Sequence, residues 1–144
     1  MYVVDTNILI YAVDKSCEKH IICFELVEDL MQGFLPWFLT WSIIYEFLRV
    51  STHPKVFKKP LTTSNSLRYI NSLFSSNSLQ ILKQGDNHSK LVQQTLSEIN
   101  GIKGNKIHDA HTAILMREHG ISKIYTRDND FHTFPFLEVI DPLN

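Results

Sequence analysis

The sequence has few cysteines and no long apolar segment, and each of these absences excludes a class of protein. The only cysteines are Cys17 and Cys23, which predicts neither a disulfide framework nor a zinc-binding knuckle. No apolar run approaches the roughly 20 residues that cross a membrane. The N-terminal residues lack a basic segment and reach an acidic residue at Asp5, so we do not expect a signal peptide. We therefore expect a reduced, cytoplasmic protein.

Acidic residues are also absent from one long segment, residues 47–85, although the net charge of the whole chain is only −1. The basic residues of this segment are Arg49, Lys55, Lys58, Lys59, Arg68 and Lys83. One interpretation is a solvated face on which basic residues cluster by chance. The other is a surface that contacts phosphate groups, because an unbalanced basic patch attracts anions. Composition alone favours neither interpretation.

Short apolar segments alternate with segments of helical periodicity along the chain. Strands are expected at residues 2–5, 36–41, 79–82, 122–126 and 137–140, helices at 7–13, 19–31, 43–50, 61–74, 87–99 and 107–119, and a loop at 127–135. Ser42 is a candidate cap for the third helix, and Gly120 for the end of the last. The alternation predicts an α/β fold with a mostly parallel central sheet. With no linker or internal repeat, we expect a single domain spanning residues 1–144.

Polar and acidic side chains follow two of the expected strands at the points where these strands end. Asp5 and Asn7 come after the first strand, and Thr126 and Asp128 come after the fourth. Glu46 lies one turn into the helix that follows the second strand. Ligands of open parallel sheets bind outside the carboxyl ends of the strands. We therefore expect these side chains to face a common site.

Two further acids, Asp109 and Asp130, belong to the same neighbourhood in this scheme. Asp109 opens a helix, and it reaches the same edge of the sheet if the loop over residues 100–106 carries the chain there. At an effective dielectric constant near 20, two carboxylates ~4 Å apart repel each other by about 4 kcal/mol. A divalent cation would offset this repulsion, and ligands that are all oxygen select Mg²⁺ or Mn²⁺. Such sites usually act on phosphates.

Each acid also has an ordinary structural explanation. Asp5 is a suitable N-terminal cap for the helix that follows it, and Asp109 suits the positive end of its own helix. Glu46 can pair with Arg49 three residues later on the same helix. We favour a functional role for Glu46, because its neighbours form an apolar helix face on which an unpaired carboxylate is costly.

Four segments resemble the PIN-domain ribonucleases, and more narrowly the VapC toxins of bacterial toxin–antitoxin pairs. These segments are VVDTNILIYA, LTWSIIYEFLRVSTHPKVF, HDAHTAILMREHG and IYTRDNDF. In the order typical of the family, they contain an Asp-x-Asn after the first strand, a Glu in an EFLR helix, an Asp that opens a helix, and a T-x-D-x-D-F loop. Any one of these motifs is unspecific, but the four occur in order over nearly the whole chain.

The resemblance implies a three-layer α/β/α sandwich and an endoribonuclease that depends on Mg²⁺ or Mn²⁺. Carried over position by position, the acidic, metal-binding and catalytic residues would be Asp5, Glu46, Asp109 and Asp128. Asn7 and Thr126 match polar residues that orient the site, and Asp130 matches a position that varies in the family. The resemblance also implies a VapB-type antitoxin that blocks the site, and a homodimer of the toxin.

The acid-free segment begins directly after Glu46, so its basic residues would flank such a site. The candidate RNA-binding residues are Arg49, Lys55, Lys58 and Lys59, with Arg127 on the opposite side. Contacts of this kind set affinity and not sequence choice. Trp37 and Trp41 are candidates for stacking on bases, although aromatic residues in and beside a strand usually belong to the core.

Rival interpretations concern other phosphate chemistry or no chemistry at all. A haloacid-dehalogenase-type phosphatase needs a second Asp two residues after the first, and this chain has Asn7 there. The His108–Asp109 pair resembles the HD-type metal phosphohydrolases, but those enzymes are helical. A zinc site built on His108 and His111 lacks further ligands. A non-catalytic module that binds RNA or a partner protein remains the alternative on the same fold.

Overall fold

The computed structural model describes residues 1–144, and the molecule is built around one five-stranded sheet. The strands are β1 (Tyr2–Val4), β2 (Trp37–Leu39), β3 (Leu79–Ile81), β4 (Lys123–Tyr125) and β5 (Glu138–Ile140). The helices are α1 (Thr6–Val13), α2 (His20–Gln32), α3 (Trp41–Ser51), α4 (Thr63–Phe74), α5 (His88–Glu98), α6 (Lys106–Glu118) and the 3₁₀ helix η1 (Asn129–Thr133). The predicted α/β fold is confirmed.

The strands lie in the order β3-β2-β1-β4-β5, and all neighbours are parallel. In the register of the central strand, Tyr2 lies between Trp37 of β2 and Lys123 of β4. Parallel strands buried on both faces are expected to be continuously apolar. Accordingly, Val3, Val4 and all three residues of β2 are buried. The sheet is therefore entirely parallel, where the sequence predicted a mostly parallel one.

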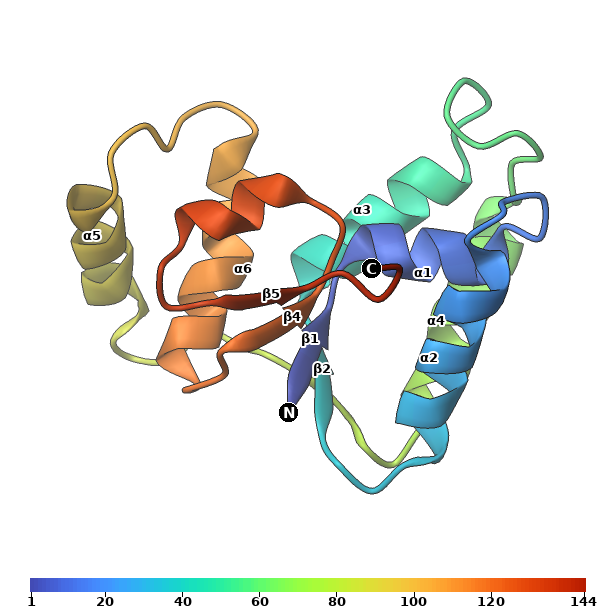
Figure 1. The fold of residues 1–144 in the computed structure, drawn as a ribbon, viewed down its shortest axis with the longest axis horizontal. Coiled ribbons are helices and arrows are strands. Elements are labelled where there is room, and N and C mark those ends of the chain that lie inside the picture. The colour runs from blue at the N-terminus through green and yellow to red at the C-terminus, as the bar shows by residue number, and fades with distance from the viewer.

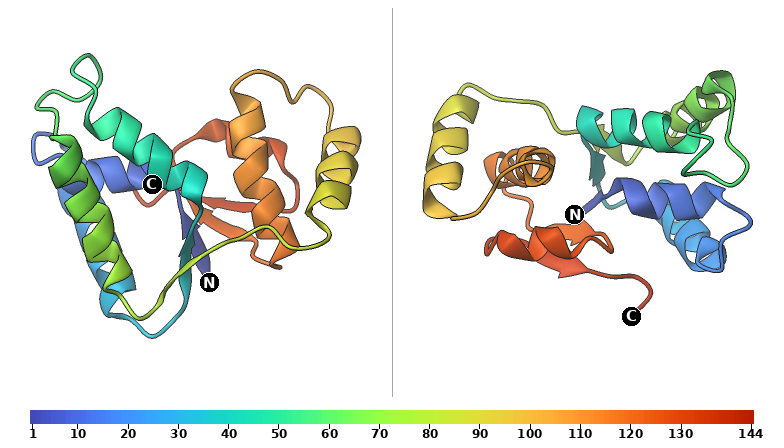
Figure 2. Two further views of the ribbon diagram at one scale, coloured as in Figure 1. Left: turned by 180° about the vertical axis from the view of Figure 1, so that it is seen from behind. Right: turned by 90° about the horizontal axis from the view of Figure 1, so that it is seen from above.

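Helices cover both faces of this sheet, as the sandwich architecture requires. The views in Figure 2 show α3 and α6 on one side of the sheet and α1 and α2 on the other. The apolar faces of these helices close one continuous core against the strands, in which the largest fully buried side chains include Trp37, Phe47, Phe131, Phe134, Ile8 and Leu9. No helix combines the length and the apolar character needed to span a bilayer.

The carboxyl ends of β1 and β4 lie at one edge of the sheet, where α1, α3, η1 and the start of α6 come together (Figure 1). Each connection from a strand to its helix begins there. The loop before α6 carries the chain back to the same edge, as the position of Asp109 required. Gly120 has a φ of +68° directly after the last helix, which confirms its predicted role as a C-terminal cap.

Two local predictions were wrong. The third helix begins at Trp41 and not at Ile43, because β2 ends at Leu39 and the extended Thr40 takes the capping position. The Thr40 hydroxyl accepts a hydrogen bond from the Ile43 N–H at 3.1 Å, which leaves Ser42 free for another contact. The segment 127–135 is also not simply a loop, because η1 forms within it.

Candidate active site

Asp5 stands at the junction of β1 and α1, and all the hydrogen bonds of its carboxylate run to residues of this edge. Its Oδ1 accepts from the Thr6 N–H at 2.8 Å, which makes Asp5 the N-terminal cap of α1. Its Oδ2 accepts from Asn7 Nδ2 at 2.9 Å and from Thr126 Oγ1 at 2.6 Å. Asp5 therefore caps α1 and also belongs to the group of polar side chains at this edge.

Thr126 and Asn7 connect the ends of the two central strands. The Thr126 hydroxyl donates to Asp5 and accepts from Asn7 Nδ2 at 3.1 Å and from the Asp128 N–H at 2.9 Å. Asn7 Oδ1 in turn accepts from the Arg127 N–H at 3.3 Å. Thr126 is fully buried, so these bonds are shielded from solvent. The network fixes where the loop after β4 leaves the sheet.

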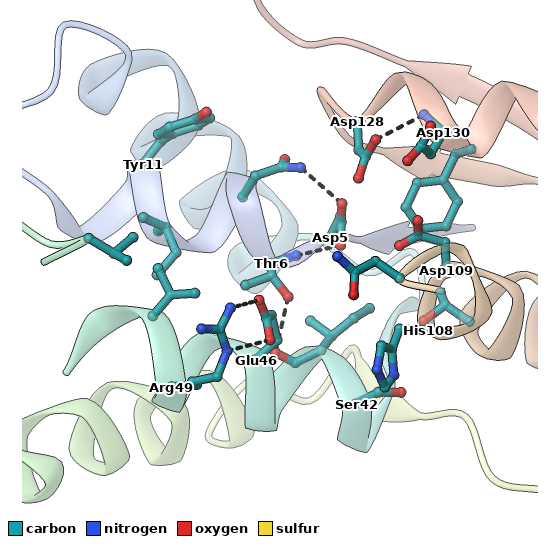
Figure 3. Close-up of a pocket in the computed structure, with 18 of the residues that line it drawn as sticks. Asp5, Thr6, Tyr11, Ser42, Glu46, Arg49, His108, Asp109, Asp128 and Asp130 are labelled. Carbon is teal, nitrogen blue, oxygen red and sulfur yellow. Dashed lines mark hydrogen bonds and ion pairs between the residues drawn. The ribbon is translucent and has the colours of Figure 1, made fainter. Parts of the chain in front are cut away.

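Three acids form the tightest carboxylate cluster of the molecule. One oxygen each of Asp109, Asp128 and Asp130 lies within 4.8 Å of the others. Asp128 caps η1 by accepting from the Asp130 N–H at 2.9 Å, and this turn directs Asp130 toward the cluster (Figure 3). Lys106 Nζ lies 3.5 Å from Asp130. The sequence pattern placed Asp130 in this neighbourhood, but it indicated only a loop over residues 127–135 and did not predict the turn that brings Asp130 to the cluster.

The charges of this cluster are unfavourable to one another. Burial raises the pKa of Asp5 to about 6, against the hydrogen bonds from Thr126, Thr6 and Asn7 that lower it. Burial also raises the pKa of Asp109 to about 7, and the negative charges of Asp128, Asp5 and Asp130 raise it further. Carboxylates whose pKa values approach neutrality indicate a site that lacks positive charge of its own.

Glu46 lies on α3 and is held by an internal partner. Arg49 donates from Nε to Glu46 Oε2 at 3.0 Å and from Nη2 to Oε1 at 2.6 Å, so the two side chains form a bidentate ion pair. This pairing lowers the pKa of Glu46. The Glu46 side chain is 45% exposed, so the expectation of an apolar surrounding was wrong, because the buried face of α3 is formed by Ile43, Ile44 and Phe47. The pairing with Arg49 that the sequence allowed is present.

These acidic side chains line one cavity of about 1000 Å³. Figure 3 shows Asp5, Asp109, Asp128 and Asp130 around one part of it, with Glu46 and Arg49 on the wall formed by α3. His108, which precedes Asp109 on α6, also lines the cavity. The structure thus brings all four sequence-predicted acids to a single space. Asp130, which the sequence placed in this neighbourhood without a defined role, and His108, which was considered only for rival metal sites, also line the cavity.

Of the predicted RNA-binding residues, some lie at the cavity and others do not. Arg49 lines the cavity, and Lys55, Lys58 and Lys59 lie in the loop between α3 and α4, whose Val56 and Phe57 also line it. Arg127 does not line the cavity, and its Nε pairs with Asp141 Oδ2 at 3.1 Å.

The two tryptophans that were candidates for stacking on bases lie elsewhere. Trp37 is fully buried in the core, as expected of a strand residue. Trp41 is 50% exposed and packs beside Tyr45 and Phe74, outside the cavity that holds the acids. Neither ring therefore faces the candidate site.

The donor set fits a hard divalent cation. The clustered ligand atoms are all carboxylate oxygens, and the only cation paired with any of them is Lys106 at the outer edge. Oxygen ligands of this kind suit Mg²⁺ and Mn²⁺ and not zinc. The fold and the site together define a class of parallel α/β proteins with an acidic ligand site at the carboxyl ends of the strands.

Comparison with known proteins identifies the family within this class. The PIN domain matches residues 2–137, so the chain belongs to the PIN-domain family, and the family resemblance of the sequence is confirmed. Over 140 residues the chain is 27% identical to ribonuclease VapC48 of Mycobacterium tuberculosis, covering 97% of this chain and 96% of the relative. Over 144 residues it is 28% identical to ribonuclease VapC43 of the same organism, covering 100% of this chain and 97% of the relative.

Solved structures share the fold at low sequence identity. The sarcin-ricin loop cleaving toxin VapC20 of M. tuberculosis superposes with a TM-score of 0.69 at 15% identity, covering 98% of this chain and 100% of that one. VapBC2 from Rickettsia felis, bound to a DNA fragment from its promoter, gives a TM-score of 0.68 at 16% identity and covers 96% of both chains. These likenesses support the fold.

Proposed function

We propose that the protein is an endoribonuclease that depends on Mg²⁺ or Mn²⁺, and that it is the toxin of a toxin–antitoxin pair. One observation carries the proposal. Acids from the end of β1, the start of α6 and the loop after β4 gather in one cavity, and their repulsion contributes to an Asp109 pKa of about 7. The names of the relatives VapC48 and VapC43 support RNA as the substrate.

Asp5, Asp109 and Asp128 would hold the ion, with Asp130 beside them and Glu46 on the α3 wall. A bound divalent ion supplies positive charge to the scissile phosphate and lowers the pKa of a water molecule. Asp5 contributes a fixed orientation, because Thr6, Asn7 and Thr126 donate to both of its oxygens. Asn7 and Thr126 are therefore positioning residues in this proposal.

Glu46 would accept the proton of the attacking water. Arg49 donates one hydrogen bond to each of its oxygens and lowers its pKa, so Glu46 is a weaker base while this ion pair is closed. A phosphate group that enters the cavity competes with Glu46 for the Arg49 guanidinium, because arginine binds phosphate and carboxylate groups in the same bidentate geometry. Binding of the substrate phosphate to Arg49 would thus free the Glu46 carboxylate from its ion pair.

The basic segment after Glu46 would hold the RNA backbone. Arg49 lies in the cavity, and Lys55, Lys58 and Lys59 belong to a loop that borders it. Arg127 would contribute only if its ion pair with Asp141 opens, so we give it a secondary role. These contacts position the substrate and do not select its sequence.

The proposal includes partners. Structural relatives are described as VapBC-1 from nontypeable Haemophilus influenzae and as FitAB bound to a DNA fragment. By analogy we infer a VapB-type antitoxin that covers the acidic cavity, a homodimer of this chain, and a cytoplasmic location where RNA is accessible.

Purified protein incubated with RNA in Mg²⁺ or in EDTA tests the proposal. We expect cleavage only with the metal, products with a 5′-phosphate and a 3′-hydroxyl, and no cleavage by Asp5→Asn. The matched control is Asp29→Asn, which changes an exposed acid on α2. Products with 2′,3′-cyclic phosphate ends would contradict attack by water. Binding of RNA without any cleavage would support a non-catalytic module instead.

A further inference from the structure

The cavity extends well beyond the acids, and its other end is apolar. Ile10 and Tyr11 of α1 line this end together with Val50 at the end of α3 and Val56 and Phe57 of the following loop. We call these five residues the apolar end. Val56 is 59% exposed and Tyr11 is only partly buried, whereas Phe57 is buried. An apolar wall that faces solvent inside a polar cavity indicates a place for a ligand.

Asp5 and Tyr11 lie toward opposite ends of α1, so the acids and the apolar end are separated along this helix. Tyr11 follows Asp5 by six positions on α1, which corresponds to about 9 Å along the helix at the usual rise of ~1.5 Å per residue. Figure 3 shows Tyr11 on α1 at the side of the cavity away from Asp109 and Asp130, with Arg49 on the α3 wall. A phosphate near the acids would therefore have its neighbouring base near Tyr11.

The charges around the apolar end suit a base and its flanking backbone. Asp14 lines the same end, and its carboxylate repels phosphate but can accept N–H groups of a base edge. The ammonium of Lys19 lies over the Tyr11 ring, 5.1 Å from its centre, so a stacking base takes the other face of the ring or displaces this ammonium. Lys55 is next to Val56 in the chain, and both cations attract the phosphate groups of a bound strand.

The Tyr11 ring is held on a rigid support. Ile8 and Leu9, three and two residues before it, are fully buried, and the Tyr11 carbonyl lies 3.0 Å from His20 Nδ1 at the start of α2. A ring whose backbone is fixed loses little freedom when a base stacks on it. Aromatic side chains of this kind are the usual platforms for unpaired bases.

We propose that the apolar end binds one unpaired nucleobase adjacent to the scissile phosphate, and that Tyr11 is the residue on which this base stacks. The inference rests on the proposed function and adds to it a binding site for one base. A base within a duplex cannot enter a cavity between α1 and the loop after α3, because it is paired and stacked on its neighbours. Tyr11 thus contributes to substrate binding and not to the chemical step.

The test compares Tyr11→Ala with Tyr11→Phe on a single-stranded RNA oligonucleotide whose cut position has first been mapped. We expect the KM of Tyr11→Ala to rise about 10-fold with kcat nearly unchanged, and Tyr11→Phe to match the unmodified protein, since stacking on one base contributes roughly 1–3 kcal/mol. Val56→Ser, at an exposed loop position, should raise KM in the same direction even if Tyr11→Ala proves unstable. Phe34→Ala is the control, because Phe34 is fully exposed in the loop before β2, at the opposite edge of the sheet.

An abasic oligonucleotide separates stacking from indirect effects. If one base occupies the apolar end, removing that base should raise KM for the unmodified protein and leave little further loss for Tyr11→Ala, so the two changes are not additive. Additive losses, an unchanged KM for Tyr11→Ala, or equal losses on duplex RNA would overturn the inference.

A binding measurement keeps this inference distinct from the proposed function. Fluorescence anisotropy of the same labelled oligonucleotide in Ca²⁺ measures binding whether or not cleavage occurs. Absence of cleavage by the unmodified protein refutes the proposed function, while weaker binding by Tyr11→Ala still supports the base site. If the unmodified protein and Tyr11→Ala bind the RNA with the same affinity, the base site is refuted. The apolar end would then have another occupant, such as a segment of a partner protein.

Discussion

Replacing Asp109 by asparagine should stabilise the metal-free protein at alkaline pH, although it removes a residue of the candidate site. Asn keeps the size of the side chain and removes only its negative charge. The pKa of Asp109 is raised from 3.8 to about 7 by burial and by the charges of Asp128, Asp5 and Asp130. The folded protein therefore binds this proton more tightly than the unfolded chain does.

The sign and size of the effect follow from this pKa. The contribution of Asp109 to stability is fully present below pH ~4 and is lost as the pH rises through about 7. At about 1.36 kcal/mol per pKa unit, the full shift corresponds to about 4 kcal/mol. Because solvent reaches part of the carboxylate and screens it, we take about half, or ~2 kcal/mol. For a chain of this size, this corresponds to roughly 5 °C in Tm.

Thermal denaturation followed by circular dichroism tests the prediction in EDTA at pH 5 and pH 8. The unmodified protein should lose stability between these two pH values, and Asp109→Asn should lose less and melt higher at pH 8. Mn²⁺ should stabilise the unmodified protein and have little effect on the variant. Asp29→Asn serves as the charge-matched control. A variant that melts at or below the unmodified protein at pH 8 would refute the idea that carboxylate repulsion dominates this cavity.

Three further predictions concern the cation and hydroxyl groups around the acids. Arg49→Ala should raise the pKa of Glu46 toward its ordinary value and increase Mn²⁺ affinity several-fold while weakening RNA binding; calorimetry showing weaker Mn²⁺ binding would contradict this. Lys58→Ala combined with Lys59→Ala should reduce the slope of log affinity against log salt by about 0.7 for each phosphate group that the variant no longer neutralises, whereas an equal reduction of affinity at all salt concentrations counts against binding of the backbone. Thr126→Val should cost about 1–3 kcal/mol in urea denaturation and lower kcat, and Thr126→Ser should restore both.

The fold was largely predictable because its signals are local. The alternation of apolar strands with helical segments placed every strand and every α-helix within a few residues, and Gly120 marked the end of α6 correctly. The error at the start of α3 arose because Thr40 and Ser42 are both good caps, and only the end of β2 decides between them. The order of the strands depends on contacts between distant residues, which no local pattern contains.

The site was predictable in its composition and less so in its arrangement. Strand ends and family motifs identified Asp5, Asp109 and Asp128, because a parallel sheet gathers such positions at one edge. Asp130 was expected near these acids, but its place in the cluster with Asp109 and Asp128 depends on the turn of η1, which the sequence did not predict. The pairing of Arg127 with Asp141 joins the loop after β4 to the segment after β5, and a count of charges along the chain does not reveal it.

The hydrogen bonds indicate that the acids of this cavity differ in what they contribute. Asp5 accepts three hydrogen bonds that fix its carboxylate, and all three lower its pKa against burial. Asp109 has no hydrogen bond among the causes that set its pKa, and only the charge of Lys106 acts against burial and the neighbouring acids. The fixed Asp5 carboxylate defines the position that a bound cation must take. The Asp109 carboxylate, whose negative charge is poorly balanced, gains the most free energy when a cation binds. Removal of Asp5 should therefore impair the geometry of the site, and removal of Asp109 should chiefly weaken its attraction for a cation.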